Sequence, residues 1–351
     1  MPREQFLMCA VTKSQPVLLD ELSDEQILGM RIMDLRLHIR SSPVEPLIKQ
    51  LYEELQARGI SFRPQCYLTD EWLCPDKVPI IGVPFFLAHP RLKRIEQKMM
   101  LDVEGGTEKE FMQLLRHECG HAFNYAYELY RRTRWRQLFG RFSTTYSDFY
   151  DIQPYSRRFV VHLSDHYAQS HPDDDFAETF AVWLNPQIDW KSKYKDWPVM
   201  RKLRYVDGLI KRTADKPPLK KADRNPPFSA DRMRSTLSAY YQRKRRTLGP
   251  EFEGYYDDNL RTLFVEGPGG DTSIKASKLL RQHRRQIVDS ITRWTRHRKY
   301  DISELLAKFI VRCDSLNLYT RGNESDSLIA VTALLTMMVS NTFRTGSKGR
   351  N

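Results

Sequence analysis

Hydrophobic positions near the start of the chain recur with the spacing of amphipathic helices. Leu28, Ile32, Leu35 and Ile39 fall on one helical face, and the stretch IKQLYEELQARG keeps a similar spacing until Gly59. Apolar residues at intervals of three and four are typical of a helix that packs one face on a core. Residues 19 to 58 are therefore expected to form a helical scaffold.

The pattern changes to short apolar runs between residues 60 and 103. The runs are ISFRPQCYLT, VPIIGVPFFLA and QKMMLDVE, and Asp, Pro and Lys residues separate them. Short runs bounded in this way favour β-strands. The segment is therefore expected to form a small sheet, which ends at Gly105 and Gly106.

A long helix is expected to begin at Glu108. Thr107 and Glu110 have the spacing of a capping box, in which each side chain bonds the backbone N–H of the other residue. The apolar spacing of EKEFMQLLRHECGHAFNYAYELYRR extends this helix to about Arg132.

A second, shorter helix is expected in DHYAQSHPDDDFAETFAVWLNP. The segment predicts a loop through Pro172 and a helix whose N-cap is Asp175, since aspartate oxygens accept hydrogen bonds from the first free N–H groups. This helix should end before Asn185 and Pro186, because the residue before a proline disfavours helical geometry.

The second half of the chain is expected to be a separate helical region. ADKPPLKKADRNPP, residues 214–227, has the composition of a linker, and residues 228–343 are mostly helical apart from a turn at EGPGGD. The run LIAVTALLTMMV is too short to span a bilayer and favours a buried helix. The predicted organisation is a first domain over 1–213, the linker 214–227, a helical region over 228–343 and a disordered tail over 344–351.

Composition is that of a folded globular protein. The 351 residues are 40% hydrophobic and 28% charged, which argues against a disordered or fibrous chain and allows more than one domain. The N-terminal residues contain no signal-peptide core. Five cysteines without C-x-x-C spacing favour free thiols in a reducing compartment, so a cytoplasmic location is expected, without membrane association.

The net charge of +12 is concentrated in one segment. Residues 201–250 contain 15 lysines and arginines against 4 aspartates. Such a segment could attract a polyanion such as nucleic acid. No zinc-finger or RNA-binding motif accompanies it, so a basic linker and solvated helix faces explain the charge equally well.

The chemistry is concentrated in the long helix, at His117-Glu118-Cys119-Gly120-His121. In this H-E-x-x-H pattern both histidines project from one helical face and can bind one metal ion, with Glu118 beside the open coordination position. The surrounding residues are largely apolar, and an isolated carboxylate buried between imidazoles without a cation is costly. The motif therefore predicts one zinc ion per chain, with Glu118 as the catalytic base. Cys119 points elsewhere and is expected to pack.

A hydrolytic zinc site requires a third protein ligand. The extended H-E-x-x-H-x-x-G-x-x-H pattern is not met, because Asn124 stands at the position of its glycine and Tyr127 at that of its third histidine. Glu178, which has apolar neighbours, is the favoured ligand, although it could instead bond the backbone in a capping box. Asp174, one turn earlier, is the alternative. With Asp175 as N-cap, Asp174 would lie outside the helix in a solvated acidic run.

Several segments together resemble a known family. RHECGHAFNYAY and YAQSHPDDDFAETFAVWL, with FRPQCYLTDEW, VPFFLAHPRL and YVDGL, are similar to the bacterial zinc-binding metallopeptidase family over roughly residues 19–210. That family resembles gluzincins. The resemblance implies an α+β, zincin-like domain with His117, His121 and Glu178 as zinc ligands and Glu118 as base. Members often have Glu-Asp-Phe-Ala-Glu where this chain begins with Asp174. By analogy with zincins, QKMMLDVE would be the sheet edge that binds an extended peptide.

The expected function is zinc-dependent hydrolysis of a peptide or other amide bond in a peptide or protein substrate. The oxyanion that forms needs a hydrogen-bond donor besides zinc, and His171 is the first candidate, with Tyr167 second. One alternative is a zincin-fold binding protein without hydrolytic activity. Another is a DNA-associated protease that uses the basic segment 201–250.

Overall fold

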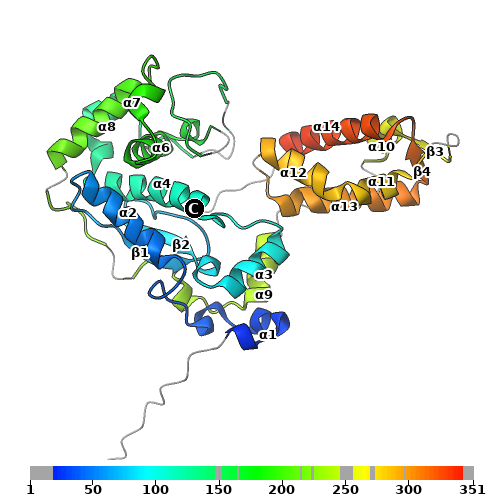
Figure 1. Ribbon diagram of the computed structural model, residues 1–351, viewed down its shortest axis with the longest axis horizontal. Coiled ribbons are helices and arrows are strands. Elements are labelled where there is room, and N and C mark those ends of the chain that lie inside the picture. Colours follow the sequence, from blue (N-terminus) through cyan, green and yellow to red (C-terminus); the bar gives the residue numbers. More distant parts are fainter. Residues whose placement is uncertain are drawn as a thin grey trace, which may run out of the picture.

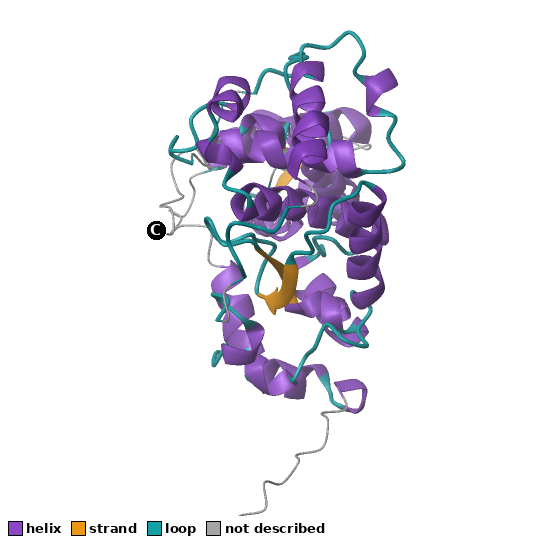
Figure 2. Cartoon of the chain, turned by 90° about the vertical axis from the view of Figure 1, so that its left-hand side faces the viewer, coloured by secondary structure: helices purple, strands orange, loops and turns teal. Residues whose placement is uncertain are grey.

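The computed structural model describes residues 19–146, 150, 152–163, 166–213, 216–222, 225–245, 256–268, 273–295 and 297–342. Their buried side chains form two hydrophobic cores, one from Leu19 to Tyr241 and the other from Leu260 to Val339. In Figure 1 the helices of the second core, coloured gold to red, gather apart from the rest. Helices predominate and strands are few and short (Figure 2), so the expected α+β class is confirmed in a mostly helical form.

The first core is built from short helices, one pair of strands and two central helices. The α-helices are α1 (Asp24–Gly29), α2 (Glu45–Ala57), α3 (Pro90–Met100), α4 (Glu108–Ala126), α5 (Thr133–Phe139), α6 (Pro172–Leu184), α7 (Trp190–Lys193), α8 (Met200–Thr213) and α9 (Leu237–Arg245). The 3-10 turns are η1 (Leu19–Glu21), η2 (Ile32–Leu35), η3 (Phe85–Ala88), η4 (Leu129–Arg131), η5 (Tyr167–Gln169) and η6 (Ala230–Arg232). The helical scaffold expected over residues 19–58 is thus confirmed, in shorter pieces.

The sheet of the first core is smaller than expected. It consists of β1 (Gln65–Thr69) and β2 (Ile80–Pro84), which pair in parallel from Gln65 opposite Ile80 to Thr69 opposite Pro84. An isolated antiparallel bridge joins Leu73 to Gly82. Every residue of β2 is buried, as its apolar run predicts.

The prediction of a strand at QKMMLDVE is wrong, because the first half of this segment is the end of α3 and the rest forms no strand. His89 caps that helix by accepting a hydrogen bond from the Arg91 N–H, and Pro90 is its first residue. Leu92, Ile95 and Met100 are buried at helical spacing. The helix ends at Leu101, which has left-handed backbone geometry. No sheet edge for a peptide therefore lies in this segment.

Helix α4 begins at Glu108 as predicted, and both hydrogen bonds of the capping box between Thr107 and Glu110 are formed. It ends at Ala126, before the expected limit of Arg132. The reason is Glu128, which has a positive φ of 47° and interrupts the helical path.

Helix α6 begins earlier than predicted. His171 is its N-cap, with Nδ1 accepting from the Asp173 N–H at 3.1 Å, and Pro172 is its first residue. The expected N-cap, Asp175, therefore lies inside the helix. The end at Leu184, before Asn185, is confirmed.

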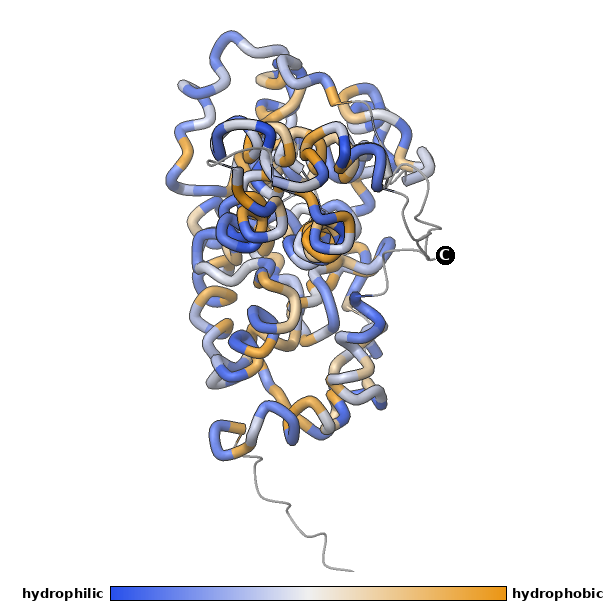
Figure 3. Tube along the Cα trace, turned by 90° about the vertical axis from the view of Figure 1, so that its right-hand side faces the viewer, coloured by the Kyte–Doolittle hydropathy of each residue, from blue (hydrophilic) through white to orange (hydrophobic). Residues whose placement is uncertain are grey.

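The second core is formed by α10 (Asp257–Leu263), α11 (Ala276–Gln282), α12 (Arg284–Trp294), α13 (Lys299–Ser315) and α14 (Glu324–Thr342), with β3 (Phe264–Glu266) antiparallel to β4 (Leu318–Thr320). Figure 3 shows that hydrophobic and hydrophilic residues are interspersed along the trace of the chain. The run LIAVTALLTMMV forms most of α14, but it is only half buried, since Ile329 and Met337 are 68% and 52% exposed. Within the described ranges no helix has the length and apolarity that crossing a membrane requires.

The first core continues beyond the expected linker. In segment 214–227, the N–H groups of Leu219 and Lys220 donate to the carbonyl of Ala126. Helix α9 then contributes Leu237 and Tyr241 to the first core. The division between the two cores therefore follows α9. The tail predicted for 344–351 lies outside the described residues.

Candidate metal centre

The helices α4 and α6 pack closely side by side, and Gly120 lies at their contact (Figure 1). A Cβ atom placed on Gly120 would lie 2.7 Å from the Cα of Ala177 on α6. The absence of a side chain is therefore what lets the two backbones approach. This contact brings the histidines of α4 against the acidic first turns of α6.

His117, His121 and Asp174 form a buried group that could hold a metal ion. The two Nε2 atoms lie 3.0 Å apart. Oδ1 of Asp174 lies 3.3 Å from Nε2 of His121 and 3.8 Å from Nε2 of His117. Its other oxygen accepts a hydrogen bond from Ser170 at 2.5 Å. Three donor atoms thus point toward one small volume.

The opposite nitrogen of each imidazole is held by a different carboxylate. Nδ1 of His117 lies 2.8 Å from Oε1 of Glu178, and Nδ1 of His121 lies 2.9 Å from Oδ2 of Asp173. A carboxylate fixes the proton of a histidine on the nitrogen that it contacts, which leaves a lone pair on the other nitrogen. Both lone pairs then face the same point.

Such an arrangement fits a bound cation. Two imidazole lone pairs that face each other at 3.0 Å repel unless a proton or a metal ion lies between them. Burial opposes protonation of His121, but Asp173 and Asp174 outweigh burial and raise its pKa well above the usual value. Glu118, Asp173, Asp174 and Glu178 surround the two rings with more negative than positive charge. The surplus favours a divalent ion at this point.

The geometry does not place Glu178 among the metal-facing groups, contrary to the expectation from sequence. One of its oxygens bonds His117, and the other accepts from the N–H of Leu163 at 2.9 Å. Asp174 instead directs its Oδ1 atom toward the Nε2 atoms of the two histidines. The physical reason is the earlier start of α6, which puts Asp174 in the first helical turn rather than in a loop.

Asp173 is a site residue that the sequence analysis missed. Its side chain accepts hydrogen bonds from Asn124 at 2.6 Å and from Tyr125 at 2.5 Å, besides its contact with His121. Burial acts to raise the pKa of Asp173, but the charge of His121, followed by these hydrogen bonds, outweighs burial and lowers it. The acidic run from Asp173 to Asp175 was interpreted as solvated, yet each of the three side chains is at most 2% exposed.

Glu118 lies beside the two imidazoles on α4 and is buried. Its carboxylate makes no hydrogen bond or ion pair with any residue that the structure describes. Burial raises its pKa, and Asp174 and Asp173 add to the rise, while His117 and His121 oppose it. A carboxylate with a raised pKa and no fixed partner can accept and release a proton. Cys119 packs in the core, as expected.

The two expected oxyanion donors have different surroundings. His171 uses both ring nitrogens within the fold: Nδ1 accepts from Asp173, and Nε2 lies 2.8 Å from the carbonyl of Thr144. It is therefore a helix cap and has no N–H left for a substrate. The ring of Tyr167 lies 5.4 Å from that of His117. Burial and nearby carboxylates raise the pKa of Tyr167 well above the usual value, which keeps its phenol protonated.

Tyr146, which sequence reasoning did not single out, stacks on His171 with ring centroids 3.7 Å apart. Tyr146 is 58% exposed, and partial desolvation of its hydroxyl, followed by the charges of Asp174 and Asp173, raises its pKa. No local sequence pattern around Tyr146 reveals this position, because it depends on the contact with His171, which is distant in sequence.

Comparison of the chain with models of protein families, with curated proteins and with solved structures gives no match.

Proposed function

We propose that this protein is a zinc-dependent hydrolase that cleaves a peptide or other amide bond. The observation that carries the proposal is the pair of Nε2 atoms of His117 and His121, 3.0 Å apart, with Asp174 beside them and a carboxylate behind each ring. Two imidazole nitrogens and one carboxylate oxygen form a ligand set that zinc uses in catalytic sites, where one position stays open.

The proposed ligands are His117, His121 and Asp174, and the proposed fold relationship is to gluzincin-like zincins, with an aspartate in place of the glutamate ligand of gluzincins. The pairing of an H-E-x-x-H helix with an acidic second helix supports this relationship. Glu178 and Asp173 orient the two histidines. Zinc in such a site supplies a lowered pKa for water, about 7, and polarises a carbonyl oxygen.

Glu118 and Tyr167 supply the proton chemistry. Glu118 takes a proton from the attacking water and returns it to the leaving nitrogen, and its raised pKa suits both transfers. Tyr167, whose phenol stays protonated, donates a hydrogen bond to the developing oxyanion. The ring of Tyr167 lies 5.4 Å from that of His117, which supports this role.

A metal-binding protein without hydrolytic activity is the second candidate. The histidines and Asp174 alone would satisfy it. The buried carboxylate of Glu118, which has no hydrogen-bond partner among the described residues, favours catalysis, because a purely structural site gains nothing from it.

The test combines metal content with hydrolysis. Purified protein should hold about one zinc ion per chain by elemental analysis, and His117→Ala or His121→Ala should abolish it. Glu118→Gln should keep the zinc and the thermal midpoint while losing hydrolysis of labelled casein and mixed peptides. Glu108→Gln, an exposed glutamate at the start of the same helix, is the matched control.

The outcomes separate the two candidates. Zinc at full occupancy in both histidine variants would exclude this centre. A Glu118→Gln protein as active as its parent would remove Glu118 from the mechanism. Stoichiometric zinc without hydrolysis of casein or peptides would favour the binding protein over the hydrolase.

A further inference from the structure

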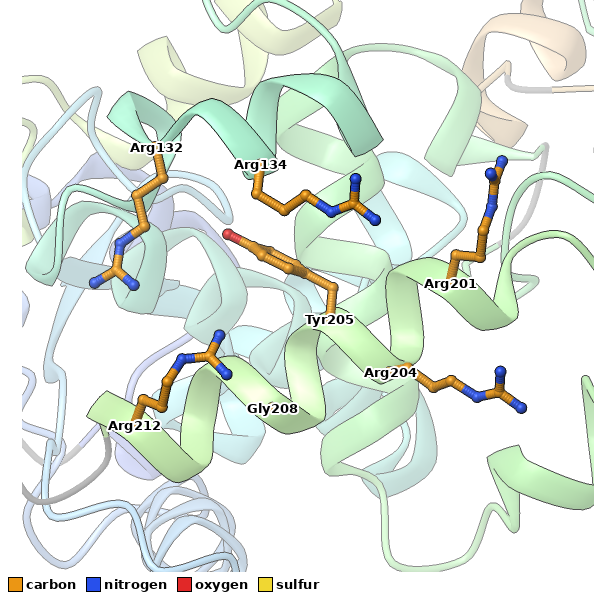
Figure 4. A pocket seen from close by; sticks show the side chains of 7 residues that line it. All are labelled: Arg132, Arg134, Arg201, Arg204, Tyr205, Gly208 and Arg212. Atoms are coloured by element: carbon orange, nitrogen blue, oxygen red, sulfur yellow. The ribbon is translucent and has the colours of Figure 1, made fainter.

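A second site of concentrated charge lies on α8 and α5. A cavity of about 540 Å³ opens there, lined by Tyr205, Gly208 and five arginines, namely Arg132, Arg134, Arg201, Arg204 and Arg212. Figure 4 shows Arg132 and Arg134 on one side and the α8 residues on the other, with Tyr205 rising between them. We call this the arginine pocket. Among the residues that the structure describes, no carboxylate lines it.

The arginines of the pocket have no acidic partner among the residues that the structure describes. Among the described residues none of the five guanidinium groups forms an ion pair, and Arg134 bonds only the amide oxygen of Gln137. The two lysines of the same helix differ. Lys202 pairs with Asp175 at 2.5 Å, and Lys211 pairs with Asp207 at 2.9 Å. The cationic side chains of α8 that form no ion pair among the described residues are therefore the three arginines that line the pocket.

Five like charges around one cavity repel one another, and an anionic ligand relieves the repulsion. Guanidinium groups present paired N–H donors that match phosphate oxygens better than an ammonium does. The hydroxyl of Tyr205 adds another polar group, since it is buried and has no hydrogen-bond partner among the described residues. The described lining residues thus present positive charge and hydrogen-bond donors to a ligand.

The pocket is elongated along the helix. Arg201, Arg204, Gly208 and Arg212 share one face of α8, and eleven residues of helix span about 16 Å. This row of residues is longer than one phosphate group and can contact several consecutive phosphates of a backbone. Gly208 leaves room between the arginines, and arginines on both walls can surround a single backbone.

We propose that the arginine pocket binds the phosphodiester backbone of a single-stranded nucleic acid. The inference does not depend on the metal centre, because no residue of the pocket belongs to that centre. It also gives part of the basic segment 201–250 a defined role, because Arg201, Arg204 and Arg212 come from that segment. Arg134 of α5 and Arg132, which directly precedes α5, complete the pocket.

The experiment measures binding of labelled single-stranded oligothymidylate to the full chain by fluorescence anisotropy at several salt concentrations. With five phosphate contacts, the logarithm of affinity should fall with the logarithm of salt concentration with a slope of about −3.5. Arg134→Gln/Arg204→Gln should weaken binding about tenfold or more and reduce that slope by about 1.4.

The matched control is Arg131→Gln/Lys211→Gln. It removes two positive charges as well, but from residues that pair with Glu128 and Asp207 and do not line the pocket. Its affinity should stay within about twofold of the parent, since the contacts in the pocket remain. Tyr205→Phe removes only an unpartnered hydroxyl, so the fold should persist while binding weakens a few-fold.

Four results would overturn the proposal. They are an unchanged affinity in Arg134→Gln/Arg204→Gln, an equal loss in the control pair, binding of inorganic tripolyphosphate without binding of the oligonucleotide, and equally strong competition by polyglutamate. The second would indicate net charge alone, the third a small polyphosphate ligand and the last an acidic peptide. Unchanged thermal midpoints in all variants exclude unfolding as the cause.

Discussion

Asp174 and Glu178 lie one turn apart on α6 and contact opposite sides of the histidine pair. Asp174 faces the Nε2 atoms, whereas Glu178 bonds Nδ1 of His117. Asp174→Ala should therefore reduce zinc well below one ion per chain. Glu178→Gln keeps an acceptor for the Nδ1 proton and should weaken zinc binding about 10- to 100-fold. Competition with a chromophoric chelator measures both affinities.

Asp196→Asn, an exposed aspartate after α7, is the control for these variants and should bind zinc like the parent. If Glu178→Ala lost its zinc while Asp174→Ala kept it, Glu178 would be the ligand after all. This expected order is the reverse of the one that the sequence favoured.

The reversal has a local physical cause. The H-E-x-x-H spacing identified His117, Glu118 and His121, because their grouping depends only on helical periodicity. The choice between Asp174 and Glu178 depended on where the next helix begins. Aspartate is a common N-cap and histidine is not, so the sequence indicated Asp175, whereas His171 caps the helix. The roles of Tyr146 and Asp173 arise from contacts between distant segments, which periodicity does not encode.

At the scale of elements, the contact between α4 and α6 limits the size of residue 120. Gly120→Ala would put a Cβ atom 2.7 Å from the Cα and 2.9 Å from the carbonyl oxygen of Ala177, so the helices would have to move apart. We expect a loss of about 1–3 kcal/mol in the free energy of unfolding. Zinc affinity should fall as well, because the ligands come from both helices. Urea unfolding and zinc titration measure these effects.

Gly29→Ala is the matched control, since an added Cβ at the end of α1 meets no atom within 4 Å. This variant should match the parent or gain slightly in stability, because alanine favours the helix. A Gly120→Ala protein with unchanged stability and zinc affinity would mean that the two helices do not approach as closely as described.

A buried ion pair joins α8 to α6. Lys202 donates to Asp175 at 2.5 Å and to the carbonyl of Arg158 at 2.8 Å. Burial raises the pKa of Asp175 to about 7, and Lys202 opposes that rise. Lys202→Met leaves the carboxylate unpaired and should cost about 3–5 kcal/mol near neutral pH and above. Urea unfolding of the zinc-free protein at several pH values measures this cost.

The pH dependence of this cost has a defined sign. A carboxyl whose pKa is raised in the folded state contributes stability at low pH and loses it as the pH rises through the folded value. The deficit of Lys202→Met should therefore shrink toward pH 4 and grow through pH 7. Asp175→Asn/Lys202→Met should show a smaller deficit with less pH dependence. A deficit that is constant with pH would assign the effect to packing rather than to the charge of Asp175.

Elements with strong capping signals were predictable, as the start of α4 at Glu108 illustrates. The strand expected at QKMMLDVE illustrates the opposite case, because a short apolar run does not separate a strand from the end of an amphipathic helix. Helix α3 is fixed by Pro90 and by the cap at His89, which precede that run. The cap and the proline precede the run QKMMLDVE, so the run alone does not reveal the helix.

For the whole molecule, the proline-rich composition of residues 214–227 suggested a domain boundary, but this segment and α9 pack on the first core. The hydroxyl of Tyr127 donates to the carbonyl of Lys216, and the N–H of Leu237 donates to the carbonyl of Met30. Composition indicates that a segment lacks regular structure. It does not indicate whether the segment separates two domains or lies along one of them.

The position of the boundary can be tested by truncation. A protein of residues 1–245 keeps α9 and should fold and bind one zinc ion, whereas one of residues 1–213 loses Leu237, Tyr240 and Tyr241 from the core. Burying a large apolar side chain contributes about 1.5–3 kcal/mol, so the three together contribute roughly 5–9 kcal/mol. That amount is comparable to the whole stability of a typical domain, about 5–15 kcal/mol.

The shorter protein should therefore lack a cooperative unfolding transition and bind zinc weakly, as circular dichroism and zinc titration would show. Residues 1–245 also lose contacts with the second core, including the stacking of Arg245 on Tyr300, but a partly exposed contact of this kind contributes only about 0.5–1 kcal/mol. A well-folded 1–213 protein would restore the boundary to the proline-rich segment. An unfolded 1–245 protein would instead mean that the first core needs the second, and that the two form one cooperative unit.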